Sequence, residues 1–395
     1  MVQIFNGIRI LDCSSYMGGP MAARLLAEFG AEVIKVERPT GDPFRASPWF
    51  AIYNRSKKGV VINLKSPAGR EAMHKLVGTA DVLIESFMPG AAQRLGIDYE
   101  TLSTLNPRLV YCSVPGFGKD GPYADVPGWE QIVQGYATIQ NYNGGLRKLL
   151  HDPIIGRKYG YGPVWSVLPF ASTYNGTQTA YAIGAALVAR ERTGKGQFME
   201  NSLFSSMLSA IAATIVRYPG VMYTSSPDQR GNPAIYRSYQ GKDGVWFFLA
   251  AGNERMVQNL YVAVDRPEWI SDTRLTRFAP LSERQDQVKG ELEEIFATKD
   301  TAEWLEILRA ADVPADYVNT VEQFMKDPQL LPENNDMVAE WEDSVLGRMK
   351  GAKSPVKASE TPPEVQGPAP ILGQDTMEIL GALGYTEQEI TALVR

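Results

Sequence analysis

Histidine and cysteine, which most often serve as general bases, nucleophiles and metal ligands, are scarce in this chain. The histidines are His74 and His151, and the cysteines are Cys13 and Cys112. The sequence holds no Cys-x-x-Cys pair and no His-Glu-x-x-His motif. These counts argue against a Ser-His-Asp hydrolase and against a histidine-rich metal site. No metal cofactor is expected.

The elements that must position the remaining polar residues alternate between strand and helix over the first part of the chain. Short apolar runs predict five strands, and helices of about ten residues separate them. The predicted strands are residues 8–12, 31–37, 60–64, 81–85 and 109–114. This alternation predicts an α/β fold in which a parallel sheet forms a Rossmann-like large domain.

The loops that follow these strands are the expected binding region, because ligands of such sheets lie beyond the carboxyl ends of the strands. They comprise residues 13–19, 38–41, 86–90 and 115–118. The first of these loops lacks the Gly-x-Gly-x-x-Gly fingerprint of dinucleotide enzymes. The sequence therefore lends little support to a nicotinamide-dependent dehydrogenase.

Three regions are expected from the pattern along the chain. Residues 1–220 form the large domain, and residues 225–330 form a smaller α+β domain with two strands followed by helices. Residues 335–395 form a proline-rich extended return and a C-terminal helix, which spans Thr376 to Val394 and rejoins the large domain. A polar loop, Phe170–Gly176, is expected to lead into a helix rich in small residues.

Several motifs occur in the order found in the class III CoA-transferases, a family that includes formyl-CoA transferase and carnitine CoA-transferase. The motifs are GIRILD at 7–12, LAEFGAEVIKVE at 26–37, NRSKK at 54–58, ADVLIESF at 80–87, VPAD at 313–316 and LGQDT at 372–376. The chain resembles this family over nearly its whole length. The resemblance implies two interlocked chains whose folding and assembly are coupled, with coenzyme A or an acyl-CoA as substrate.

The resemblance also implies which residues contact coenzyme A. The positions that match its adenine and phosphate contacts in formyl-CoA transferase are Arg38, Ile62, Lys65, Ser86, Phe87 and Arg94. Guanidinium and ammonium groups suit phosphate oxygens, and an aromatic ring could cover the adenine. The alternative interpretation is that the two arginines are solvated surface residues and that Phe87 belongs to the core.

The resemblance further places Ser172 where the family has its nucleophilic aspartate, four residues before Gly176. A carboxylate can attack a thioester and later leave from the resulting anhydride, whereas a serine hydroxyl needs a base to become a nucleophile. Glu130 matches an active-site glutamate of the family, and its alternative interpretation is a carboxylate that stabilises a helix N-terminus. The catalytic candidates are therefore Ser172, as a degenerate nucleophile position, and Glu130.

Three functions remain open on these residues. In the first, the chain is the subunit without the aspartate in a heteromer, such as succinyl-CoA:benzylsuccinate CoA-transferase, and a homologous partner supplies the nucleophile. In the second, it is a complete CoA-transferase that uses another carboxylate. In the third, it is a non-catalytic or racemase-like acyl-CoA-binding protein. The first two move CoA from an acyl-CoA, for which succinyl-CoA is a candidate, to a carboxylic acid.

Three aromatic residues, Trp165, Phe170 and Tyr174, flank the Ser172 position and would suit a bulky acyl group, unless they are core residues. The net charge of −6 argues against nucleic acid or an anionic membrane surface as a partner. Two cysteines that fall in or beside predicted strands are expected to be buried free thiols in a reducing cytoplasm.

Overall fold

The computed structural model of the chain describes residues 3–140, 165–216, 218–219, 230–231, 233–277 and 282–394. The chain divides into two compact units. The first comprises Met1–Thr138, Ser166–Val216 and Gln329–Arg395, and the second comprises Ile139–Trp165 and Arg217–Pro328. Within the described ranges, no helix combines the length and the apolar content needed to cross a lipid bilayer.

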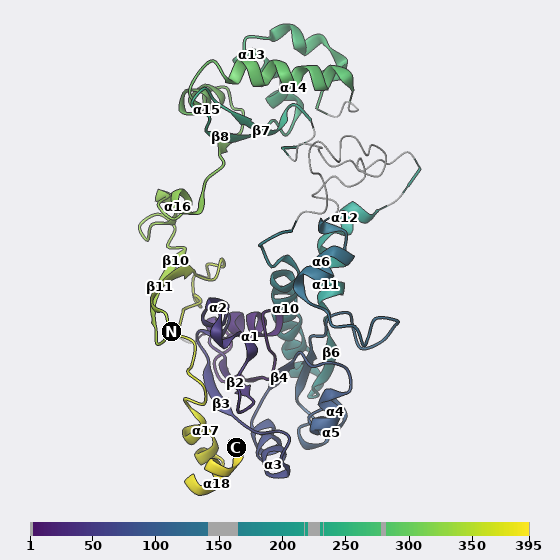
Figure 1. Cartoon of the computed structure of the whole chain (residues 1–395), viewed down its shortest axis with the longest axis vertical. Coiled ribbons are helices and arrows are strands. Elements are labelled where there is room, and N and C mark those ends of the chain that lie inside the picture. Colours follow the sequence, from purple (N-terminus) through teal and green to yellow (C-terminus); the bar gives the residue numbers. More distant parts are fainter. Residues whose placement is uncertain are drawn as a thin grey trace. The chain divides into compact units, whose positions relative to one another are not determined.

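A six-stranded parallel sheet organises the first unit. Its strands are β1 (Arg9–Asp12), β2 (Glu32–Glu37), β3 (Lys58–Val61), β4 (Val82–Glu85), β5 (Val110–Ser113) and β6 (Gln197–Glu200). They lie in the order β3-β2-β1-β4-β5-β6, and Figure 1 labels β3, β2, β4 and β6 among them. From β1 the chain adds β2 and β3 on one side and β4 to β6 on the other. This reversal lies between β1 and β4, where sheets of this kind bind their ligands.

Helices cover both faces of the sheet because successive side chains of each strand point to opposite faces. The helices of this unit are α1 (Gly18–Glu28), α2 (Pro48–Asn54), α3 (Pro67–Val77), α4 (Ala91–Leu95), α5 (Tyr99–Leu105), α6 (Glu130–Tyr136), α10 (Phe170–Thr193), α11 (Leu203–Ala210), α12 (Ala212–Ile215), α17 (Thr376–Ala382) and α18 (Glu387–Leu393). Ile10 packs with α1 and α10 on one face, and Leu11 packs with α3, α5 and the C-terminal helices on the other. The expected α/β class is confirmed.

The second unit holds a three-stranded antiparallel sheet with helices packed against it. Its elements are β7 (Tyr236–Gln240), β8 (Trp246–Ala250), β9 (Ala315–Tyr317), α13 (Glu254–Ala263), α14 (Glu283–Phe296), α15 (Thr301–Ala310) and α16 (Val321–Phe324). The strand order is β7-β8-β9. Phe247 and Phe296 are fully buried in its core, and their rings meet edge to face with centroids 5.0 Å apart. This unit therefore has a hydrophobic core of its own.

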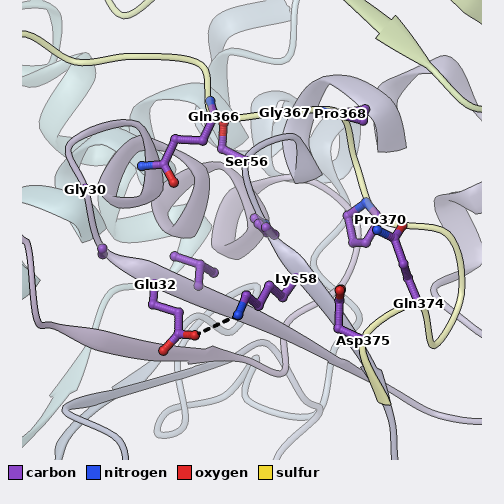
Figure 2. A pocket seen from close by; sticks show the side chains of 13 residues that line it. Gly30, Glu32, Ser56, Lys58, Gln366, Gly367, Pro368, Pro370, Gln374 and Asp375 are labelled. Carbon is purple, nitrogen blue, oxygen red and sulfur yellow. Dashed lines mark hydrogen bonds and ion pairs between the residues drawn. The ribbon is translucent and has the colours of Figure 1, made fainter. Parts of the chain in front are cut away.

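The C-terminal segment covers the β3 edge of the sheet. Asp375 donates its amide to the Gly59 carbonyl at 2.9 Å and accepts the Gly59 amide through its carboxylate at 2.7 Å. Figure 2 shows this segment, from Gln366 to Asp375, across a pocket from the Glu32–Lys58 ion pair of strands β2 and β3. The edge strand is thus paired rather than open to solvent.

The structure differs from the expected elements at several places, and in the second unit a third strand, β9, follows the two expected strands and the helices. The sixth strand, β6, was not expected. The expected extended return contains a hairpin, β10 (Val338–Asp343) and β11 (Gly347–Ala352), whose two strands pair in antiparallel fashion. The expected single C-terminal helix is two helices, which Gly384 separates with a φ of +89° that favours glycine.

Candidate functional site

A cavity of about 710 Å³ opens at the carboxyl ends of strands β1 to β4. Its volume falls within the roughly 300–1,000 Å³ of typical small-molecule sites. The loops that line it follow β1 (residues 13–16), β2 (residues 38–43), β3 (residues 62–65) and β4 (residues 86–88). Parallel strands bring these four loops together because all of them end at the same edge of the sheet.

Five of the six residues expected to contact coenzyme A line this cavity. They are Arg38, Ile62, Lys65, Ser86 and Phe87. Arg38 and Lys65 are exposed, and Ile62 is buried with 1% of its surface accessible. The sixth residue, Arg94, is an exposed residue of α4 and does not line the cavity, although its neighbour Leu95 does.

Buried ion pairs hold the loop that carries Arg38. The Lys35 ammonium donates to the Asp42 carboxylate at 3.0 Å and to the Ser14 carbonyl at 2.5 Å. Asp42 donates its amide to Glu37 at 2.8 Å, and Arg38 closes the loop by donating to the Gly41 carbonyl at 3.0 Å. The side of the cavity formed by this loop is therefore fixed to strand β2.

A second buried pair, Asp12 and Lys57, lies behind the β1 loop. The fully buried Lys57 ammonium donates to Asp12 at 2.7 Å, to the Asn54 side chain at 2.8 Å and to the Pro20 carbonyl at 2.9 Å. Burial lowers the pKa of Lys57 to about 8. Burial alone would raise the pKa of Asp12, but the charges of Lys35 and Lys57 keep it below its ordinary value. The pair therefore remains charged at neutral pH.

Ser172 and Glu130 meet at the start of helix α10. The Ser172 hydroxyl donates to one oxygen of the Glu130 carboxylate at 2.5 Å, and the Ser172 amide donates to the same oxygen at 2.8 Å. The other carboxylate oxygen accepts the Ala171 amide at 2.8 Å and the Gln134 side-chain amide at 2.6 Å. Glu130 thus satisfies two of the amides that the first turn of a helix leaves without partners.

The expected loop at Phe170–Gly176 is wrong, because α10 begins at Phe170. Ser172 is therefore the third residue of a 24-residue helix, and 3% of its surface is accessible. Short polar residues suggested a loop, since they often compete with the backbone for hydrogen bonds. Here Glu130 caps α10, and α1 packs against α10. Both contacts favour the helical conformation of residues 170–176.

Close packing of α10 on α1 fixes the position of Ser172, through glycines on each helix. A Cβ atom on Gly176 would lie 2.8 Å from the Met21 Cβ and 2.9 Å from the Gly18 carbonyl oxygen. Ser172 lies one helical turn before this crossing. The crossing therefore holds the first turn of α10, and with it Ser172, against α1.

We expect Gly176→Ala to destabilise the chain by about 1–3 kcal/mol, since the added methyl group must push α10 away from α1. Gly184→Ala is the matched control in the same helix. Its Cβ would meet only the Phe5 ring, at 3.8 Å, and alanine favours a helix over glycine by about 1 kcal/mol. Urea denaturation of both variants checks this, and equal midpoints would contradict the close crossing.

Tyr16 links the cavity to the Ser172–Glu130 pair, and no sequence pattern indicated this role. Its ring lines the cavity and meets the Trp129 ring edge-on with centroids 4.7 Å apart. Trp129 directly precedes Glu130. Tyr16 has a φ of +68°, a left-handed conformation that non-glycine residues rarely adopt. Such strain is often found at functional sites, but the residue type alone does not reveal it.

The aromatic residues that flank Ser172 are exposed in the single chain. Phe170 exposes 41% of its surface, Tyr174 47% and Trp165 67%. They are therefore not part of the core of this chain, and a bulky acyl group remains a proposal for them. His151 lies outside the described residues.

The part of the chain that the structure describes contains no group of three or more histidine, cysteine, aspartate or glutamate side chains that could hold a metal ion. Cys13 and Cys112 are buried free thiols, as expected. Burial raises the pKa of both thiols, Cys112 to about 12, so neither is ionised at neutral pH.

The chain is similar to CoA-transferases of other organisms over almost its full length. It is 31% identical to succinate–glutarate CoA-transferase of Agrobacterium fabrum, over 98% of this chain and 97% of the relative. It is 27% identical to formyl-CoA:oxalate CoA-transferase of Shigella sonnei, over 98% and 97%. A solved structure of a CaiB/BaiF family protein from Brucella suis aligns with a TM-score of 0.79 and 29% identity, covering 97% of this chain and 100% of that one.

The sequence profile of CoA-transferase family III matches residues 5–376. The match covers both units as far as residue 376, and it includes the loops of the cavity, Glu130 and Ser172. The motifs found in the sequence, the parallel sheet and these similarities agree. The chain belongs to CoA-transferase family III.

Proposed function

We propose that the chain binds a CoA thioester in the cavity above β1 to β4 and takes part in moving CoA from an acyl-CoA to a carboxylic acid. The observation that carries this proposal is the convergence of Arg38, Ile62, Lys65, Ser86 and Phe87 on one cavity. The two cations would hold phosphates, and Phe87 would contact the adenine. The strand order β3-β2-β1-β4-β5-β6 supports a Rossmann-like domain with its ligand at the switch point.

We propose that this chain works beside a homologous, aspartate-bearing subunit in an interlocked heteromer. Four hydrogen bonds engage the Glu130 carboxylate. These bonds use the carboxylate as the N-terminal cap of α10, and its oxygens would have to give up hydrogen bonds to attack a carbonyl. Ser172 could not return the acyl group to CoA easily, since an ester is lower in energy than a thioester. Full exchange would therefore need a carboxylate from the partner.

A second candidate function follows from the same contact. Glu130 places a carboxylate oxygen 2.5 Å from the Ser172 hydroxyl, next to the position where relatives have the aspartate. If this carboxylate attacks the thioester carbon, the C–S bond breaks, CoA leaves as a thiolate, and a mixed anhydride forms on Glu130. The lone chain would then be a complete CoA-transferase.

The names of the relatives suggest which substrates to test. Succinate–glutarate CoA-transferase of Agrobacterium fabrum and the human succinyl-CoA:glutarate CoA-transferase, 28% identical, are both named for dicarboxylic acids. We propose succinyl-CoA as donor. CoA exchange between succinyl-CoA and a panel of acids distinguishes the two candidate functions. The exchange is measured with the lone chain and with the chain co-expressed with its homologous, aspartate-bearing subunit. Exchange that requires the aspartate-bearing subunit supports the heteromer. Full exchange by the lone chain supports Glu130 as the nucleophile.

We expect Arg38→Ala to weaken coenzyme A binding by about tenfold or more, because one charge-assisted phosphate contact contributes roughly 1.5–3 kcal/mol. Lys195→Ala is the control, since Lys195 is an exposed cation beyond the C-terminal end of α10. Calorimetric titration with free CoA measures both variants. An unchanged dissociation constant for Arg38→Ala would place the phosphates elsewhere.

A further inference from the structure

We infer that Ser172, Glu130 and Gln134 form a nucleophile, a base and an orienting group, and that the lone chain hydrolyses acyl-CoA through an acyl ester of Ser172. This inference rests on the proposed function for substrate binding, since the thioester must reach Ser172 from the cavity. It goes beyond that function because water, rather than an acid or CoA, receives the acyl group. It also gives the serine in the aspartate position a chemical role of its own.

The geometry matches the requirements for an activated hydroxyl nucleophile. Such a site needs a base within about 2.6–3.2 Å of the nucleophile and a third group that orients the base. Here the Ser172 hydroxyl donates to Glu130 at 2.5 Å, and the Gln134 side-chain amide donates to the other Glu130 oxygen at 2.6 Å. Gln134 is fully buried, and its side-chain amide also donates a hydrogen bond to the Leu168 carbonyl at 3.0 Å. The base is therefore fixed in place.

One feature of the surroundings, the N-terminus of α10, favours negative charge at the Ser172 oxygen once its proton has passed to Glu130. Ser172 lies in the first turn of α10, where the aligned peptide dipoles of a long helix give partial positive charge, and the Ala171 and Ser172 amides of this turn donate to Glu130. Tyr53 lies nearby, hydrogen-bonded to the Thr173 side chain. Burial raises the pKa of the Tyr53 phenol, and the negative charge of Glu130 raises it further. Tyr53 therefore stays neutral and adds no negative charge that would oppose ionisation of Ser172.

The reaction balances without an added oxidant or cofactor. The Ser172 hydroxyl passes its proton to Glu130 while its oxygen bonds to the thioester carbon. The C–S bond then breaks, and the CoA thiolate leaves with the proton from Glu130. In the second half of the reaction, Glu130 takes a proton from water while the water oxygen bonds to the ester carbon. The C–O bond to Ser172 then breaks, and the proton on Glu130 passes to the Ser172 oxygen. The products are free CoA and a carboxylic acid.

Access for the thioester and for water is available on the side of Glu130. Ser172 itself is buried, whereas Glu130 is half-exposed and its neighbour Trp129 exposes 50% of its surface. Tyr16 contacts Trp129 and also lines the cavity. A pantetheine arm that leaves the cavity past Tyr16 would therefore arrive beside the pair, and we place the acyl group there.

The test measures release of CoA thiol by the purified full chain from succinyl-CoA, acetyl-CoA and benzoyl-CoA, with no acid acceptor present. We expect Ser172→Ala to lower the rate at least about 100-fold and Glu130→Gln to lower it at least about tenfold. Thr177→Ala is the matched control, since Thr177 is an exposed hydroxyl one turn further along α10. Acid-quenched samples are digested, and the acyl adduct is located by mass spectrometry.

An acyl ester on Ser172, together with loss of thiol release in Ser172→Ala, supports the inference. An adduct on Glu130, or equal rates in the wild type and Ser172→Ala, overturns it. Titration of Ser172→Ala with free CoA separates this inference from the proposed function, because CoA binding without any serine-dependent hydrolysis leaves the proposed function standing. Thermal melting of each variant shows that it is folded.

Discussion

Replacing Ser172 with aspartate should give the isolated chain CoA-transfer activity, with a gain on the order of 100-fold or more in exchange between succinyl-CoA and a carboxylic acid. The new carboxylate would stand in the first turn of α10, one turn before the Gly18–Gly176 crossing that fixes the helix. It could attack the thioester and leave from the anhydride. Radiolabelled acid converted to its CoA ester measures the exchange.

The matched control for Ser172→Asp is Ser172→Asn, because Glu130 lies beside this position and the effect of the added charge must be separated from that of the added shape. Glu130 already lies 2.5 Å from the Ser172 hydroxyl, so the introduced aspartate and Glu130 would be two carboxylates in contact, and their mutual repulsion would disfavour the state in which both are charged. Ser172→Asn has nearly the same shape without the charge and should gain nothing. Equal activity of the two variants, or no gain with aspartate, would show that Ser172 is not in the nucleophile position.

Replacing Lys57 with methionine should lower the free energy of unfolding by about 3–5 kcal/mol, which is the usual result of removing one partner of a buried ion pair. The Lys57 ammonium is fully buried and has three hydrogen-bond acceptors, so the substitution leaves the Asp12 charge with a weaker partner, Lys35, at 3.9 Å. The shift of the urea midpoint measures this cost.

Lys58 offers a control on the next residue. Its side chain is 40% exposed, and it pairs with Glu32 and Glu378 at 3.2 and 3.1 Å. Lys58→Met should change stability by no more than about 1 kcal/mol, since water and salt screen such pairs. Similar losses for the two methionine variants would mean that burial does not determine the effect of Lys57.

Acid should act on the same buried cluster through Asp12. Its pKa in the folded chain is below the ordinary 3.8. The stability that this difference provides is present above the ordinary value and disappears as the pH falls through the folded value. Asp12→Asn should therefore show a smaller loss of stability between about pH 5 and pH 2 than the wild type, as measured by thermal melting. Parallel acid profiles would contradict this.

The first five strands could be predicted from the sequence because each is an apolar run between helical segments, buried on both faces. The sixth, Gln197–Glu200, has polar residues at both ends, and its edge position exposes them. The hairpin strand Val338–Asp343 pairs two apolar residues at its start and two charged residues at its end, so it lacks the regular alternation that predicts a strand. Periodicity reports burial, and these strands are only partly buried.

In the candidate site, too, some features could be predicted from the sequence and others could not. The cavity residues could be grouped in advance, since each follows a parallel strand and all such strands end at one edge. The contact between Glu130 and Ser172 joins residues 42 positions apart and depends on where α6 packs. The left-handed conformation of Tyr16 depends on its packing against Trp129 and Phe44. Tertiary contacts of this kind have no local signature in the sequence.

The pairing of Asp375 with Gly59 has a consequence for synthesis of the chain. The ribosome completes β3 more than three hundred residues before it makes the segment that covers it. During that interval the emerging polypeptide carries a bare strand edge, which can pair with other chains. Until the ribosome has made the segment around Asp375, the growing protein therefore has no cover on this edge against self-association.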